Sequence, residues 1–342
     1  MSGQFPYRRR DFTIGLGLLL AAIAQSSWAQ EPTKQHRIAI VIASGPVTRL
    51  NDPTSTAWRA FWEELRWLGD VEGENLTVER YSGEGRPERY ADLAREVVSR
   101  NPDVIVAVTN PTALAIRAAT GTIPIVWIGA DAIRFGLVTN LAHPGGNITG
   151  VSRYDLEFYG KLLQILKEVV PSASRLGWLM PRRVWEGAYG QVTQRVFQDA
   201  AKRLGVSLIP MLVRDSTESE YRRVFAEIAP APPDAIGVSD IADLFPYRRL
   251  IVELVERSRL PAIYGYREYV EAGGLMAYEG ELGELGRRMA NDVHEILNGA
   301  KPVDIPIYQQ TEFALIINLK AAEALGLTMP PSLLARADEV IE

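Results

Sequence analysis

The sequence contains no cysteine among its 342 residues and has three histidines. The absence of cysteine excludes disulfide bonds, thiolate metal sites, a catalytic thiol and a lipid-modified cysteine anchor. His36 precedes the first predicted strand, His143 lies in a turn and His294 lies in a predicted helix. No two of them have the spacing of metal ligands, so we expect a protein without a bound metal ion.

Motifs of the common enzyme classes are also missing. The segment that ends the first predicted strand reads IASGPVTRL (42–50) and lacks the glycine pattern of a dinucleotide site. The chain has no Walker A sequence and no G-x-S-x-G nucleophile elbow. Carboxylates are plentiful, but none is paired in a way that indicates a general acid and base. These absences favour binding over catalysis and predict neither catalytic residues nor a cofactor.

Long hydrophobic runs are scarce, and the mean hydropathy is −0.04. Residues 14–24 form an apolar run of eleven residues, which is too short to span a bilayer. Three arginines at 8–10 precede this run, and Ser27-Trp28-Ala29 places small residues where a signal peptidase reads. We therefore predict a cleaved signal peptide at residues 1–29, with a membrane-anchored N-terminal helix as the alternative. The arginines leave both twin-arginine and general export open.

No run of five or more basic residues occurs after residue 29. That part of the chain carries 34 basic and 41 acidic side chains, a net charge of −7. Nucleic-acid binding needs a positive surface that neutralises phosphates, so it is disfavoured.

Short apolar runs alternate with amphipathic stretches over the rest of the chain. Residues 37–43 and 104–108 are typical of buried strands, and residues 55–69 have the apolar spacing of a helix. The alternation begins again after a predicted strand at 148–151, without a flexible linker. Alternating strands and helices predict parallel sheets with right-handed crossovers. We therefore expect an α/β fold of two doubly wound parallel-sheet lobes with a ligand cleft between them.

Open α/β sheets bind ligands beyond the carboxyl ends of their strands. The candidate ligand-binding residues in the corresponding loops are Ser44, Thr109, Asn110, Thr112, Asp131, Trp185, Asp240, Tyr264 and Tyr266. Several have a purely structural alternative: Asn110 as a helix cap, Asp131 and Asp240 as turn residues, and Trp185 as packing on a lobe surface. The neighbouring Arg182 and Arg183 are expected to be solvated.

The chemistry of these residues suits a small organic anion or zwitterion with an apolar or aromatic body. The helix start at 110–112 offers free backbone amides for a carboxylate, and Ser44 and Thr109 add hydroxyl groups. Asp240 would take an ammonium group, if the ligand has one. Flat apolar walls are expected from Tyr264, Tyr266 and Trp185.

Several motifs occur in order along the chain. They are RRRDF at 8–12, AIRFGLVTNL at 132–141, HPGGNITGV at 143–151, YVEAGGLMA at 269–277, LNGAKP at 297–302 and IINLKAAEALGLTMPPSLLARADEVIE at 316–342. Together they resemble the ABC-transporter substrate-binding proteins, in the family that includes tryptophan- and other aromatic-amino-acid-binding members. The resemblance runs over nearly the whole chain after residue 29.

This resemblance implies a type I periplasmic binding protein, whose chain crosses three times between lobes. Residues 36–151 with 278–304 would form lobe one, and residues 152–277 with 305–342 would form lobe two. It also implies a monomeric periplasmic protein that captures a small solute, amino-acid-like or an aromatic carboxylate. The lobes would close on the solute like a hinge, and the closed form would dock on an inner-membrane permease. A periplasmic receptor for a sensor kinase or chemoreceptor would use the same binding chemistry and stays open as the alternative.

Two loops depart from the commoner family pattern. Residues 180–185 read MPRRVW where members often carry an Asn-Pro-containing loop, and Asp131-Ala132 replaces the usual Asp-Pro. Both loops lie where the ligand is expected, so the ligand of characterised members does not carry over.

Overall fold

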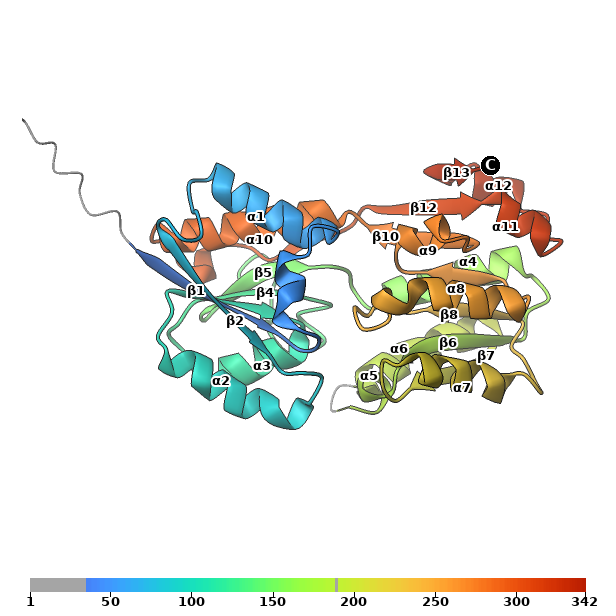
Figure 1. The fold of residues 1–342 in the computed structure, drawn as a ribbon, viewed down its shortest axis with the longest axis horizontal. Helices are drawn as coiled ribbons and strands as arrows, with labels where there is room; N and C mark the ends of the chain where they lie inside the picture. The colour runs from blue at the N-terminus through green and yellow to red at the C-terminus, as the bar shows by residue number, and fades with distance from the viewer. Residues whose placement is uncertain (1–34, 188–189) are drawn as a thin grey trace, which may run out of the picture. The chain divides into compact units, whose positions relative to one another are not determined.

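The computed structural model describes residues 35–187 and 190–342, so the predicted signal peptide at 1–29 lies outside the described residues. The described chain forms two separate, mainly parallel sheets, each covered by helices on both faces (Figure 1). Among the described residues, no helix has the length and apolar character needed to cross a membrane.

The sheet of lobe one has six strands, and every pairing in it is parallel. In spatial order the strands are β11 (Tyr308–Gln309), β5 (Ile148–Ser152), β4 (Ile125–Gly129), β3 (Val104–Val108), β1 (His36–Ile42) and β2 (Leu76–Ser82). The central strands are almost fully buried, as expected for a parallel sheet with both faces covered.

Two pairs of helices cover the lobe-one sheet. On one face α1 (Thr56–Trp67) and α10 (Leu282–Leu297) lie side by side, and α2 (Tyr90–Ser99) and α3 (Asn110–Ala119) cover the other (Figure 1). A Cβ atom at Gly286 of α10 would lie 2.1 Å from the carbonyl oxygen of Ala57 in α1, so glycine is what permits this close helix packing. The short 3-10 helices of this lobe are η1 (Val47–Asn51), η2 (Pro87–Arg89) and η4 (Pro302–Asp304).

The sheet of lobe two has seven strands. In spatial order they are β13 (Glu339–Ile341), β12 (Phe313–Asn318), β10 (Met276–Gly280), β9 (Ala262–Tyr264), β8 (Ala235–Val238), β6 (Arg175–Pro181) and β7 (Ser207–Val213). The β10–β12 pairing is antiparallel, whereas the other pairings are parallel. The helical segments of this lobe are α4 (Glu157–Val169), α5 (Arg182–Glu186), α6 (Gly190–Leu204), α7 (Glu218–Ile228), η3 (Phe245–Tyr247), α8 (Arg248–Arg257), α9 (Arg267–Glu271), α11 (Leu319–Ala324) and α12 (Pro331–Leu334).

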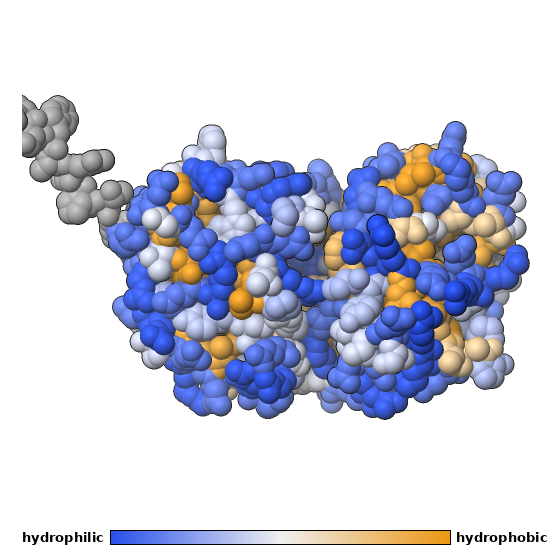
Figure 2. Space-filling view, viewed as in Figure 1, coloured by the Kyte–Doolittle hydropathy of each residue, from blue (hydrophilic) through white to orange (hydrophobic). Residues whose placement is uncertain are grey.

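Hydrophilic side chains dominate the face of the molecule drawn in Figure 2, and apolar side chains appear there in separate areas. Among the described residues, Trp67 is the most exposed large apolar side chain, at 79%. Scattered exposed apolar residues of this kind are normal on a protein surface.

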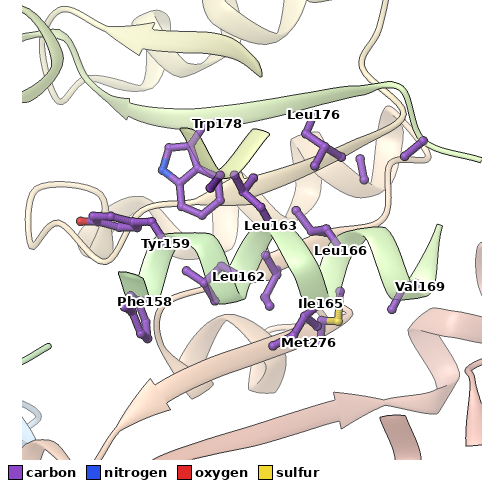
Figure 3. Packing of buried hydrophobic residues seen from close by; sticks show 14 of the residues in the cluster. Phe158, Tyr159, Leu162, Leu163, Ile165, Leu166, Val169, Leu176, Trp178 and Met276 are labelled. Atoms are coloured by element: carbon purple, nitrogen blue, oxygen red, sulfur yellow. The ribbon is translucent and has the colours of Figure 1, made fainter. Parts of the chain in front are cut away.

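Helix α4 is fixed to the lobe-two sheet by its apolar face. Leu163 and Leu166 point toward Leu176 and Trp178 of β6, and Ile165 lies beside Met276 of β10 (Figure 3). Each of these side chains is almost fully buried. Burial of one such side chain contributes about 1.5–3 kcal/mol. The packing therefore holds the start of lobe two rigidly after the first crossing between lobes.

The ends of the strands and helices place the three crossings at residues 153–156, 281 and 310–312. The structure differs from the sequence expectation at the later two. Strand β10 stays in lobe two up to Gly280, beyond the expected return at 278. Strand β11 pairs with β5 in lobe one, although lobe two was expected from residue 305. In both cases the pairing partner is distant in the sequence, and the local apolar pattern does not reveal it.

Candidate functional site

A cleft of about 1010 Å³ lies between the lobes. Lobe one contributes the loops after β1, β3 and β4, together with parts of α1 and α10, and lobe two contributes the loops after β6, β8 and β9. The aromatic side chains that line it are Trp58, Tyr90, Phe135, Tyr154, Phe245 and Tyr266. The charged side chains that line it are Arg49, Asp52, Arg153, Arg183, Asp243, Arg248 and Glu268. The cleft is thus a largely apolar space with a few charged groups, the usual character of a small-molecule site.

The lobe-one wall contains the start of helix α3. Thr109 lines the cleft with a φ of 85°, a conformation that is strained for a β-branched residue and is typical of functional sites. The Asn110 side chain donates from Nδ2 to the carbonyl oxygen of Ala130 at 2.7 Å and accepts the Ala130 amide at Oδ1 at 3.2 Å. Asn110 therefore ties the loops after β3 and β4 together instead of capping the helix with its side chain. The first turn of α3 leaves backbone amides without partners inside the helix.

A polar bridge joins the two lobes at the cleft. Ser44, after β1, donates its hydroxyl to Oδ1 of Asp243 in lobe two at 2.5 Å. Arg183 pairs with Oδ2 of the same carboxylate, and its Nη2 lies 3.4 Å from Oγ of Ser44. Arg183 was expected to be solvated, but its side chain is 26% exposed and takes part in this bridge.

A second charged pair lies at the first crossing, where Arg153 follows β5. Its Nη2 is 2.8 Å from Oδ2 of Asp240, which follows β8 and is 2% exposed. The Tyr154 and Tyr159 hydroxyls donate to Oδ1 of Asp240 at 3.1 and 3.4 Å. The Tyr266 hydroxyl donates to the backbone carbonyl of Asp240 at 2.5 Å. The buried carboxylate thus faces one guanidinium and two phenols, while a third phenol binds the backbone of the same residue.

Burial and charge act together on the ionisation of this cluster. Burial disfavours the charged form of Arg153, but the Tyr266 and Asp240 side chains outweigh it and raise the pKa of Arg153 above its usual range. Burial and the Asp240 carboxylate raise the pKa of Tyr154 and of Tyr159. Burial also raises the pKa of Tyr266. At neutral pH the tyrosines are therefore neutral donors and the arginine is a fixed cation.

The structure brings four of the candidate residues to the cleft: Ser44, Thr109, Asn110 and Tyr266. Asp240 lies directly behind the cleft, where it is enclosed by Arg153 and the tyrosines. The other candidates make structural contacts. Thr112 donates its hydroxyl to the backbone carbonyl of Val108, and Asp131 accepts the backbone amides of Arg134 and Leu156.

Two predicted aromatic walls are core residues instead. Tyr264 is 1% exposed and stacks on Tyr269 with ring centroids 4.8 Å apart. Trp185 is 8% exposed and packs against Phe197 of α6 with ring centroids 6.0 Å apart. The alternative interpretation of Trp185, that it packs on its own lobe, agrees with this placement. For Tyr264 the expected role as a ligand wall is corrected, because its ring fills the lobe-two core.

Sequence reasoning missed Arg153, Tyr154 and Asp243. A signal for the first two was present, since they directly follow β5 and the carboxyl ends of parallel strands face the ligand. Asp243 lies four residues after Gly-Val-Ser at the end of β8, on a loop whose course the sequence does not define.

Two lobes of parallel α/β architecture, joined by three crossings and enclosing a cleft, define a protein that holds small molecules between its lobes. The chain belongs to the ABC transporter substrate binding protein family, which matches residues 51–341. This confirms the predicted family, whose members bind solutes and are not enzymes.

Several known proteins are similar to this chain. The chain is 24% identical over 278 residues to the tyrosine-binding protein of Clostridioides difficile (strain R20291), covering 79% of this chain and 76% of that protein. A conserved domain protein from Vibrio cholerae has a TM-score of 0.75 at 26% identity, covering 90% of this chain and 100% of that one. An ABC domain from Streptococcus pneumonia in complex with L-Trp has a TM-score of 0.74 at 24% identity, with the same coverage of 90% and 100%. These likenesses confirm the fold as type I periplasmic binding protein-like.

Proposed function

We propose that this protein is the solute receptor of an ABC importer and binds a small carboxylate or amino-acid-like molecule between its lobes. The observation that carries the proposal is the cleft of about 1010 Å³, whose lining includes aromatic rings, the Arg153 side chain and the start of helix α3. Rings provide contact area for an apolar body, and a guanidinium and free helix amides are suited to a carboxylate. The tyrosine-binding and L-Trp-bound relatives support an aromatic solute.

In this proposal the solute holds the lobes together. Ligand groups contact both walls of the cleft, while the three crossings act as the hinge. The bridge from Ser44 to Asp243 then forms part of the closed state. A ligand that contacts both lobes binds the closed form better than the open form and shifts the population toward it.

The receptor would act in the periplasm as a monomer and pass its solute to an inner-membrane permease. The predicted signal peptide at residues 1–29 supports this location. Cell fractionation of the full-length chain tests it: the protein is expected in the periplasmic fraction, shortened by cleavage near Ala29. Retention of the full-length chain in the cytoplasm would contradict the location without affecting ligand binding.

A thermal-shift screen of the purified protein tests the binding function. The library should contain amino acids, aromatic and aliphatic carboxylates, sugars and nucleosides. A true ligand at a hundredfold excess over its dissociation constant stabilises the folded state by about 2.7 kcal/mol, which raises the melting temperature measurably. Calorimetric titration of each hit should give one site per chain. The absence of any shift or binding heat across the library would refute the proposed function.

A further inference from the structure

We propose that the cleft selects a carboxylate that lacks an α-ammonium group, with Arg153 as the residue that binds the carboxylate. This inference rests on the proposed function and decides between its two solute classes. It follows from how Arg153 and Asp240 are arranged, because the acidic residue that would attract an ammonium group is already neutralised.

The Asp240 carboxylate is not accessible to a ligand, because the residue is 2% exposed and both of its oxygens face other side chains. Its Oδ1 receives the hydroxyls of Tyr154 and Tyr159, and its Oδ2 faces the Arg153 guanidinium at 2.8 Å. The void beside Asp240 has a volume of about 10 Å³, which is too small for an ammonium group together with the rest of a ligand. An amino acid would have to displace Arg153 from its ion pair before its own ammonium could reach Asp240.

Arg153 lines the cleft and has side-chain donors that make no hydrogen bond within the described part of the chain. Its Nη2 carries the contacts to Asp240 and Tyr266, and within the described residues no hydrogen bond involves its Nε or Nη1. The side chain is 23% exposed and lines the cleft. Its contacts to Asp240, Tyr266 and the Tyr154 ring hold the guanidinium in place. A fixed guanidinium with two free nitrogens can bind a carboxylate through paired hydrogen bonds.

The other acidic residues of the cleft differ in how accessible they are. Asp243 is bound on both oxygens by Ser44 and Arg183. Asp52 accepts the amide and hydroxyl of Thr54 at 2.9 and 2.7 Å. Glu268 also lines the cleft, and its enclosed Oε2 has no hydrogen-bond partner. The alternative is therefore that a ligand ammonium group binds Glu268. The experiment includes a Glu268 variant for this reason.

The test compares matched ligands by calorimetric titration of the purified protein. Phenylalanine, tyrosine and tryptophan carry both charged groups. Phenylpropionate, hydroxyphenylpropionate and indolepropionate have the same bodies and the carboxylate alone, and phenethylamine has the amine alone. The best carboxylate should bind about tenfold or more tightly than its amino acid, and phenethylamine should not bind.

Substitution of Arg153 gives a second readout that a merely structural role would not produce. Arg153→Gln removes the carboxylate donor and uncovers the negative charge of Asp240. The preference should therefore reverse, with the carboxylate weakened about tenfold or more and the amino acid strengthened. If this variant does not fold, the double variant Arg153→Gln/Asp240→Asn keeps a neutral buried pair. The double variant should lose the preference for the carboxylate without gaining affinity for the amino acid.

Each outcome supports or overturns the inference. Equal or tighter binding of the amino acids by the unaltered protein overturns it, and a loss of that binding in Glu268→Gln would assign the ammonium to Glu268. Binding of an uncharged solute such as a sugar, with none of the matched ligands, also overturns it. In these cases the proposed receptor function still stands. Failure of every compound in the wider library would refute both.

Discussion

The Ser44 hydroxyl donates a 2.5 Å hydrogen bond to Asp243, a residue 199 positions later in the chain and on the opposite lobe. Arg183 binds the other oxygen of the same carboxylate, so one side chain of lobe two joins residues from both lobes. All three residues of this bridge line the proposed ligand cleft. Its formation should therefore depend on how closely the lobes approach one another.

Asp243→Ala should weaken ligand binding roughly tenfold. The substitution removes the bridge and so reduces the population of the closed state, which binds the ligand. A hydrogen bond to a charged group contributes about 1.5 kcal/mol, close to the 1.4 kcal/mol of a tenfold change. Calorimetric titration measures the effect. Asp199→Ala, an exposed aspartate on α6, is the matched control and should leave the affinity unchanged. An unaltered affinity in Asp243→Ala would mean that the bridge does not contribute to closure.

Tyr264→Phe should stabilise the protein by about 1 kcal/mol and leave ligand affinity unchanged. The Tyr264 hydroxyl is enclosed and has no hydrogen-bond partner, so its removal relieves a desolvation penalty. Tyr264→Ala should lower the free energy of unfolding by about 3–5 kcal/mol, because it leaves a large cavity beside Tyr269. Urea denaturation measures both variants. A loss of affinity in Tyr264→Phe without a change in stability would indicate that the Tyr264 hydroxyl contacts the ligand.

Tyr266→Ala should weaken binding about tenfold or more, because this ring lines the cleft and holds the guanidinium of Arg153. Tyr266→Phe keeps the ring but removes the hydroxyl that donates to the Asp240 carbonyl. The difference between the two affinities separates the contribution of the ring from that of the hydroxyl. If Tyr266→Ala binds the ligand as tightly as the unaltered protein does, the ring is not part of the site.

Glu279→Gln should flatten the pH dependence of stability between about pH 4.5 and pH 7. Burial raises the pKa of Glu279 from 4.5 to about 7, so in this range the folded state keeps a proton that the unfolded state releases. The unaltered protein should therefore lose stability as the pH rises through the range. Burial also raises the pKa of Asp292 to about 7, so Glu279→Gln/Asp292→Asn should flatten the curve further. Urea midpoints at several pH values measure this. Identical pH curves for all three proteins would contradict it.

The sequence predicts the repeating elements well, because parallel strands buried on both faces appear as continuous apolar runs. Strand β3 (Val104–Val108) matches the expected bounds, and strand β5 starts at the expected residue 148. The extent of β10 and the pairing of β11 could not be predicted in the same way. These depend on β12 and β5, partners far away in the sequence.

The candidate site was predictable in position but only partly in its residues. The rule that ligands bind at the carboxyl ends of strands indicates the loops with Ser44, Asn110 and Tyr266, and these residues line the cleft. It does not tell which way a ring at the end of a strand points. Tyr264 ends β9 and turns into the core, where a Cβ atom on Gly274 would lie 2.5 Å from its ring. Tyr266, two residues later, lies outside the strand and reaches the cleft.

The sequence also does not reveal which charged side chains meet, as the pairing of Arg153 with Asp240 shows. Asp240 alone suggests an ammonium site, whereas in the structure Arg153 already occupies that position. Arg153 lies in the first crossing and Asp240 lies 87 positions later in lobe two, so their contact depends on the course of that crossing. Only the three-dimensional arrangement reveals that the acidic group is neutralised.

The distance between the lobes during ligand titration tests the proposed receptor most directly. Because the chain has no cysteine, Glu96→Cys on α2 and Lys202→Cys on α6 would give two labelling sites, one on each lobe. Spin-label distance measurements should give a broad distribution without ligand. They should give a single narrow distribution once the best carboxylate of the matched panel saturates the protein. A distribution that stays the same at saturating ligand would contradict closure of the lobes around a bound solute.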